Sequence, residues 1–169
     1  VYNALEACAE HLEQFGGHMY AAGMTLKEEN YQNFKNAFEK VVESTIHPDL
    51  LIPEISVDLE IKFSAINEKF MRILKQFEPF GPENMTPVFM SENVVDSGYA
   101  KTLGNDAEHL KVFVKQNDSP NFNAIGFGLG KKLDVVKNKQ PFDAVYIVEE
   151  NEWNGKVSLQ LQLRDIRAK

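Results

Sequence analysis

Apolar residues in the first third of the chain recur at the three- and four-residue spacing of an amphipathic helix. Leu5, Cys8, Leu12 and Phe15 predict a helix over about residues 1–15. Two glycines follow at once, and glycine commonly ends a helix. The same patterns predict a strand over residues 21–26, a helix over 31–46, a strand over 55–61 and a helix over 65–77.

From residue 88 onward the pattern changes to short alternating stretches, which predict strands. We expect strands at residues 88–95, 109–116, 122–127, 143–150 and 157–165, and a short helix over 131–138. Five strands with a helix after the third is the order of an OB-type β-barrel, a fold that binds oligonucleotides on one curved face. A small open sheet with a helix fits the same pattern. The chain is therefore expected to be an α+β protein.

Residues 78–87 separate these two patterns. Three prolines and one glycine interrupt all periodicity there, which is typical of a rigid connection between domains. We therefore expect two domains, residues 1–86, which end in a connecting helix, and residues 87–169, which form the OB-like domain.

Composition places the chain among globular proteins. The 169 residues are 43% hydrophobic, and no apolar run approaches the roughly 18 residues of a membrane span. The one cysteine, Cys8, can form no disulfide within the chain, so we expect a reducing, cytoplasmic environment. The helical pattern is already under way at Val1, which predicts a piece of a longer protein.

Charge is distributed unevenly along the chain. A net charge of −7 argues against a protein that coats nucleic acid. Residues 1–86 hold 14 acidic and 7 basic residues, whereas residues 87–169 hold 11 of each. The second half is therefore the better candidate for contact with a polyanion.

Residues 15–23 read Phe-Gly-Gly-His-Met-Tyr-Ala-Ala-Gly and form the first candidate site. Backbone N–H groups can crowd around an anion at Gly16 and Gly17, because glycine reaches positive φ and carries no Cβ. His18 can add a hydrogen bond or a charge to the same anion. The alternative is an ordinary glycine cap at the end of a helix, with His18 on the surface.

The second strand of the expected barrel carries the clearest nucleic-acid signal. Leu110, Val112 and Val114 alternate with four residues of the opposite face, which are His109, Lys111, Phe113 and Lys115. A phenylalanine between two lysines offers a stacking surface flanked by charges for phosphates, as in sequence-independent single-strand binding. The alternative is that Phe113 packs under a loop or against the first domain, while the lysines only keep an edge strand soluble.

Two further candidates lie around the later strands. Lys131 and Lys132 begin a cluster that continues with Lys137 and Lys139, which indicates either phosphate contacts or a solvated face. Trp153 precedes an Asn-Gly hairpin turn, a position that is either a rim for ligand or a packing anchor.

Other chemistries find no support. The glycine-rich stretch 126–131 lacks the first glycine of a phosphate-binding loop, and Lys132 stands where Ser or Thr would hold magnesium. The four histidines have no spacing with Cys or Asp that builds a metal site.

Two segments resemble the DHH phosphoesterases. Gly-Gly-His at 16–18 with Ala-Ala-Gly at 21–23 resembles the signature of the DHH-associated domain. Residues 79–87 resemble the Pro-Phe-Gly…Asn…Pro segment that leads into the OB domain of RecJ-type exonucleases, although Glu83 and Met85 replace the commoner Gly and Pro. Since the resemblance covers nearly the whole chain, it implies a C-terminal fragment of such an exonuclease. The first domain would be a partial α/β DHH-associated domain with helices packed on a small sheet.

This resemblance also implies a function. The substrate would be single-stranded DNA, degraded from 5′ to 3′ in recombination and repair, with Gly16, Gly17 and His18 on a substrate phosphate. No Asp-His-His run is present. The resemblance therefore assigns catalysis, with Mn²⁺ or Mg²⁺, to an N-terminal domain outside this sequence, and the fragment alone is expected to be inactive and to bind no cofactor. Expected partners are single-stranded DNA and single-stranded-DNA-binding protein or other repair proteins, and no membrane.

Two alternatives stay open at this point. The chain could come from a DHH phosphodiesterase that acts on short oligonucleotides or cyclic dinucleotides. It could also be a non-catalytic OB-type module that binds proteins. The dependence of DNA affinity on strand length separates the three.

Overall fold

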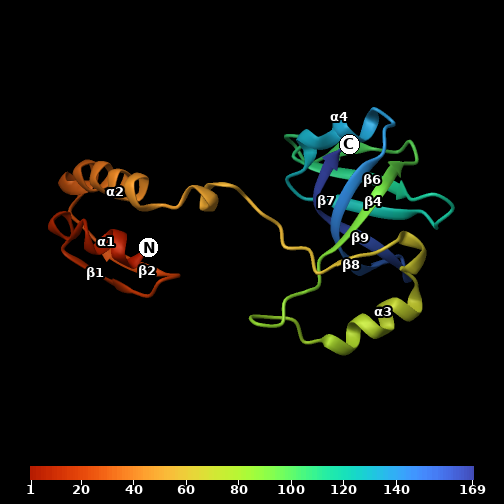
Figure 1. The fold of residues 1–169 in the computed structure, drawn as a ribbon, viewed down its shortest axis with the longest axis horizontal. Helices are drawn as coiled ribbons and strands as arrows, with labels where there is room; N and C mark the ends of the chain where they lie inside the picture. The colour runs from red at the N-terminus through yellow and green to blue at the C-terminus, as the bar shows by residue number, and fades with distance from the viewer. The chain divides into compact units, whose positions relative to one another are not determined.

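The computed structural model describes all residues 1–169 and divides them into two compact units (Figure 1). The N-terminal unit is Val1–Glu54 and the barrel unit is Ile55–Lys169. The sequence placed a boundary after residue 86 instead. The difference has a physical cause, because Phe63 and Ile66 are buried in the core of the barrel unit and not in that of the N-terminal unit.

The N-terminal unit combines two helices with a β-hairpin. Its elements are α1 (Tyr2–Glu6), β1 (Gln14–Gly17), β2 (Ala22–Thr25) and α2 (Tyr31–Thr45), with short 3-10 turns between them. Leu5, Cys8 and Phe34 form its buried core. The predicted strand over 21–26 and helix over 31–46 are confirmed by β2 and α2.

The prediction of a helix over residues 1–15 is largely wrong. The observed helix α1 ends at Glu6, and Gly16 and Gly17 belong to strand β1, which pairs antiparallel with β2. The helical spacing of Leu5 and Cys8 is real, but the chain passes through a 3-10 turn over Ala9–His11 and then extends. The glycines therefore do not cap a helix.

The barrel unit is built on a seven-stranded sheet. Its strands are β3 (Leu59–Glu60), β4 (Phe89–Asp96), β5 (Lys101–Leu103), β6 (His109–Lys115), β7 (Phe122–Gly126), β8 (Phe142–Trp153) and β9 (Lys156–Ala168). β4 pairs with β8, β8 with β9, β9 with β7, β7 with β6, and β6 again with β4, so these pairings form a cycle. All pairs of the cycle are antiparallel except β7 with β9. The unit is thus an OB-like, sheet-rich domain with few helices.

Two helices complete the barrel unit. α3 (Glu68–Leu74) begins after Asn67, whose side chain accepts the Phe70 N–H at 3.0 Å, and it buries Met71 and Leu74. α4 (Leu133–Lys137) buries Val136 and contacts β4 and β9 at one end of the barrel (Figure 1). The helix expected over 65–77 is thus shorter than predicted and begins later in the chain.

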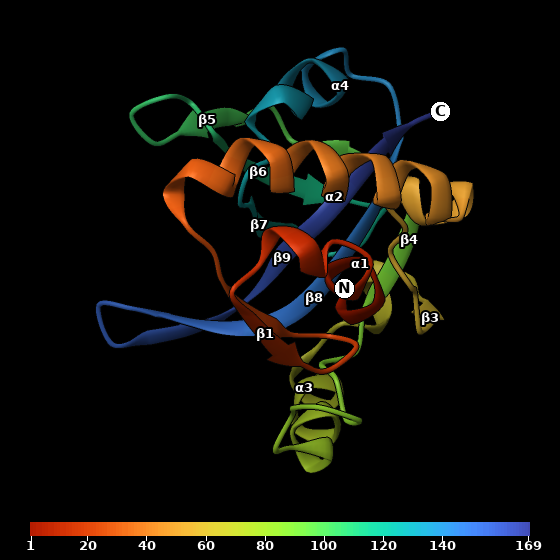
Figure 2. The same ribbon diagram turned by 90° about the vertical axis from the view of Figure 1, so that its left-hand side faces the viewer.

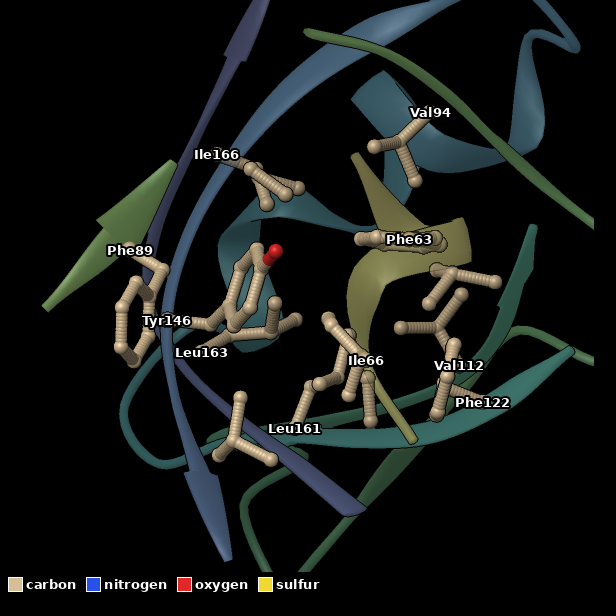
Figure 3. Close-up of a cluster of buried hydrophobic side chains, with 14 of the residues drawn as sticks. Phe63, Ile66, Phe89, Val94, Val112, Phe122, Tyr146, Leu161, Leu163 and Ile166 are labelled. Carbon is tan, nitrogen blue, oxygen red and sulfur yellow. The ribbon is translucent and has the colours of Figure 1, made fainter. Parts of the chain in front are cut away.

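Buried aromatic and aliphatic side chains together fill the core of the barrel unit (Figure 3). Phe63 is fully buried, and its ring packs edge-on against Phe122 and Tyr146, with centroid distances of 5.4 and 5.8 Å. The hydroxyl oxygens of Tyr146 and Ser91 lie 2.6 Å apart, and Ser91 donates to the Ile61 carbonyl. Burial raises the pKa of Tyr146 well above its ordinary value, so the phenol is neutral and can donate to Ser91. The segment before α3 is therefore tied to the barrel core.

The strands differ from the sequence prediction in two places. The strand expected at 55–61 shortens to Leu59–Glu60, because its apolar residues are mostly exposed and only a short parallel pairing with β4 forms. Strand β5 was not predicted, since three residues are too few to show an alternation.

Candidate nucleic-acid interface

Strand β6 presents the face that the sequence singled out. Leu110, Val112 and Val114 are at most 1% exposed, whereas the alternate residues lie on the outer face. Burial therefore confirms the predicted alternation. The role of the outward residues stays a prediction.

The outer face of β5, β6 and β7 forms an open groove of about 550 Å³. Its lining includes Tyr99, Lys101, Lys111, Phe113 and Asn123. The rings of Tyr99 and Phe113 lie 6.3 Å apart at 78°, and Tyr99 is 72% exposed. The groove thus offers two aromatic rings to a ligand.

Two lysines face each other across this groove. Lys101 of β5 is directly opposite Lys111 of β6 in the antiparallel register. The lysines of the barrel unit that form ion pairs are Lys75, Lys132 and Lys169, so neither groove lysine has a partner. Like charges opposite each other destabilise a sheet pair. A bound anion between them would relieve this repulsion.

Neutral amide groups extend the face beyond the lysines. Asn123 of β7 lies opposite Gln160 of β9, and Ile125 lies opposite Gln162. The Gln160 side chain donates to Glu149 at 2.9 Å. The surface is therefore basic and aromatic over β5–β6, whereas amide side chains line it where β7 pairs with β9.

Sequence reasoning missed Tyr99 and Lys101. Both precede or begin the short strand β5, which brings them beside Phe113 and Lys111. A signal was available in the sequence. Tyr99 and Lys101 are separated by one residue, and Lys111 and Phe113 repeat this spacing in the reverse order. Only the antiparallel pairing makes these residues neighbours.

His109 is engaged by its surroundings. Its Nδ1 accepts the Gly128 N–H at 3.2 Å, its Nε2 lies 3.5 Å from the Glu108 carboxylate, and its ring meets that of Phe127. The Glu108 carboxylate accepts a hydrogen bond from the backbone N–H of Glu108 itself. This bond lowers the pKa of Glu108, against the smaller opposing effect of burial. His109 therefore fixes the ends of β6 and β7, and a ligand would have to displace one of these contacts.

The remaining sequence candidates lie apart from the groove lining. Lys131 is exposed, whereas the Lys132 ammonium is 3.1 Å from Asp165 and donates to the Ile166 carbonyl, so it holds β9. Lys115 continues the outer face of β6 at its far end.

Trp153 ends β8 at the tip of a long hairpin. Asn154 and Gly155 both have positive φ, of 50° and 73°, which confirms the predicted two-residue turn. The hairpin of β8 and β9 projects beyond the rest of the barrel unit (Figure 2). Trp153 is 73% exposed, so it is not an anchor of the core.

The Gly-Gly-His segment lies in the N-terminal unit, in the β1–β2 hairpin. Gly17 has φ of 143°, and a Cβ there would collide with the Ala21 carbonyl. The His18 N–H donates to that carbonyl at 2.7 Å, so the turn uses this amide. Gly16 has open space around it, and the His18 side chain is exposed.

No group of three His, Cys, Asp or Glu side chains in the chain could hold a metal ion. The residues of this chain therefore do not fit a Mn²⁺ or Mg²⁺ site. None of the helices is long and apolar enough to cross a membrane.

Comparison with known proteins shows the family to which the chain belongs. The RecJ OB domain family matches residues 57–165. The single-stranded-DNA-specific exonuclease RecJ of Bacillus subtilis strain 168 is 28% identical over 165 residues, which cover 98% of this chain and 21% of the relative. RecJ of Escherichia coli K12 is 26% identical over 157 residues, covering 90% of this chain and 26% of the relative.

A solved structure has the same fold. The crystal structure of RecJ in complex with Mn²⁺ from Thermus thermophilus superposes with a TM-score of 0.75 at 23% identity, over 99% of this chain and 24% of that one. This chain spans about a quarter of the length of the relatives it matches. The chain is homologous to the C-terminal region of RecJ, and it belongs to the RecJ OB domain family.

Proposed function

We propose that this chain binds single-stranded DNA as the C-terminal part of a RecJ-type exonuclease that degrades DNA from 5′ to 3′ in recombination and repair. The observation that carries the proposal is the groove over β5–β6, where two aromatic rings lie beside two unpaired lysines. Bases stack on aromatic rings and phosphates bind lysines in sequence-independent single-strand binding.

The groove suits a single strand better than a duplex. Tyr99 and Phe113 can contact the faces of bases only when these are unpaired. Lys101 and Lys111 neutralise phosphates. The Asn123 amide can donate a hydrogen bond to any base or accept one from it. None of these contacts requires a particular base, so we expect affinity without strong sequence preference.

The two units would serve one reaction. We propose that Val1–Glu54 is part of a DHH-associated domain, in which Gly16, Gly17 and His18 hold a substrate phosphate. The cycle of β4, β6, β7, β9 and β8 would be the five-stranded OB barrel that holds the strand further along. Hydrolysis would belong to a metal-dependent catalytic domain outside this chain. The chain alone is then expected to bind DNA and not to cleave it.

Fluorescence anisotropy with labelled single-stranded oligonucleotides of increasing length tests the proposal. Stacking contributes about 1–3 kcal/mol per base, so Phe113→Ala should weaken binding by about 5- to 150-fold. Lys111→Ala should weaken it and reduce its salt dependence. Phe77→Ala and Lys69→Ala are matched controls, since both residues are exposed on or after α3 and line no part of the groove.

Each result separates the candidate functions. Affinity that grows over several nucleotides supports the exonuclease. Affinity already complete with a dinucleotide would instead favour a DHH phosphodiesterase for short substrates. No affinity at low salt refutes DNA binding and favours a protein-binding module.

A further inference from the structure

A second hollow opens at the far end of β6 and belongs to none of the sites above. It has a volume of about 890 Å³ and lies between the end of β4, the β6–β7 loop and the segment that leaves α4. Its lining includes Lys115, Lys137 and Lys139, together with Asn117 and Asn121. With Val95 and Asp96 of β4, the lining comes from three separate parts of the chain.

The charge of this pocket is unbalanced. None of its three lysines takes part in the ion pairs of the barrel unit. The lining also holds two carboxylates. Asp96 accepts the N–H groups of Gly98 and Ala100 through Oδ2 at 2.8 and 3.4 Å, whereas its Oδ1 is buried without a partner. The other carboxylate is Asp118. With three lysines against two carboxylates, the lining keeps a small positive surplus, which favours an anionic ligand.

Uncharged donors complete the lining. The side chains of Asn117 and Asn121 form no hydrogen bond within the protein, whereas the Ser119 hydroxyl is used by its own loop. Lys139, which also lines the pocket, has φ of 61°, an uncommon conformation for lysine. Amide N–H groups and ammonium groups together are suitable donors for phosphate oxygens.

The pocket and the groove follow each other along the outer face of β6. Phe113 and Lys111 line the groove, and Lys115 lines the pocket on the same face of the same strand. At a strand rise of about 3.4 Å per residue, Lys115 lies about 14 Å from Lys111. A single strand lying along β6 would therefore pass from one to the other.

We propose that this pocket binds a backbone phosphodiester of the single strand that crosses the groove, with Lys115, Lys137 and Lys139 as its cationic contacts. The proposal rests on the proposed DNA binding and extends the track beyond the groove. It gives Lys137 and Lys139, at the end of α4 and just after it, a phosphate contact, where the sequence alone left a solvated face as the alternative.

The test compares Lys137→Ala/Lys139→Ala with Lys40→Ala/Lys69→Ala in the 169-residue chain. Both double variants remove two exposed lysines that have no ion pair, but the control residues lie outside the pocket. Each phosphate contact to a single strand contributes about 0.7 to the slope of log affinity against log salt. The pocket variant should therefore lose about 1.4 from this slope. Between about 50 mM and about 200 mM salt, its loss of affinity should be about sevenfold smaller than that of the parent.

Strand length gives a second readout. For the pocket variant, the gain of affinity with length should stop at a shorter oligonucleotide than for the parent and the control. If the parent binds DNA and the pocket variant matches the control in slope and length, the pocket proposal alone is refuted. If the parent binds no DNA at low salt, the proposed function fails and this proposal fails with it. Thermal melts of all variants check that folding is unchanged.

Discussion

Replacing Phe63 by alanine tests the division of the chain into its two units. Phe63 is fully buried, packs edge-on against Phe122 and Tyr146, and lies before residue 86, where the sequence placed the boundary. Removing a buried phenylalanine ring typically costs about 3–5 kcal/mol, because apolar contacts are lost and a cavity remains. Edge-on aromatic pairs add about 0.5–1.5 kcal/mol beyond area burial, so we expect the upper part of that range.

Urea unfolding gives the total cost, and hydrogen exchange read by mass spectrometry gives its location. The Phe63→Ala variant should lose protection in β4–β9, while α2 keeps the protection of the parent. Phe34→Ala is the reciprocal variant, because Phe34 is buried in the core of the N-terminal unit with Leu5 and Cys8. Phe77→Ala, at 59% exposure, should cost little. A cost below about 1 kcal/mol for Phe63→Ala, or a loss of protection confined to α1 and α2, would refute this reasoning.

Two further predictions concern single residues of the barrel unit. Burial opposes ionisation of Asp143, but the hydrogen bond from Arg167 at 2.9 Å and the charge of Lys169 outweigh it and lower its pKa. The stabilisation by ionised Asp143 is complete above the pKa that Asp143 has in the unfolded chain, and it is lost as the pH falls. Asp143→Asn should therefore destabilise the protein at pH 7 and progressively less below about pH 4. Urea unfolding across pH would contradict this if the difference in unfolding free energy between parent and variant stayed constant. Gly130→Ala should lower the free energy of unfolding by about 1–3 kcal/mol, because a Cβ at this position would overlap the Ala107 carbonyl. Gly16→Ala is the control, because a Cβ there meets no atom and should change the melting temperature little. Equal melting temperatures for the two variants would contradict the expected clash.

The parts of the fold that the sequence predicted are those governed by local pattern. β6 was readable because one of its faces is buried and the other is not, so apolar and polar residues alternate strictly. α2 was readable because Phe34 and its neighbours line one helical face. The turn after Trp153 was readable from Asn-Gly alone.

The parts that were missed depend on distant residues. The apolar stripe that begins at Phe63 was visible, but nothing local says that it covers the barrel instead of the N-terminal unit. Phe15 fits a helical spacing although it lies in a strand, because its partner Met24 comes from a later segment. The groove and the pocket are both assembled from residues far apart in the chain, and no spacing rule brings Lys115 to Lys137 and Lys139.

The pairing of β7 with β9 has a consequence for synthesis of the chain. These strands are parallel neighbours, yet the whole of α4 and β8 lies between them in the sequence. Until residues 160–162 have left the ribosome, the outer edge of β7 has no partner, and the ring of strands stays open. An open edge can pair with another chain. The barrel must therefore close after translation has passed β9, and a transcript truncated before that strand would yield an aggregation-prone product rather than a shorter barrel.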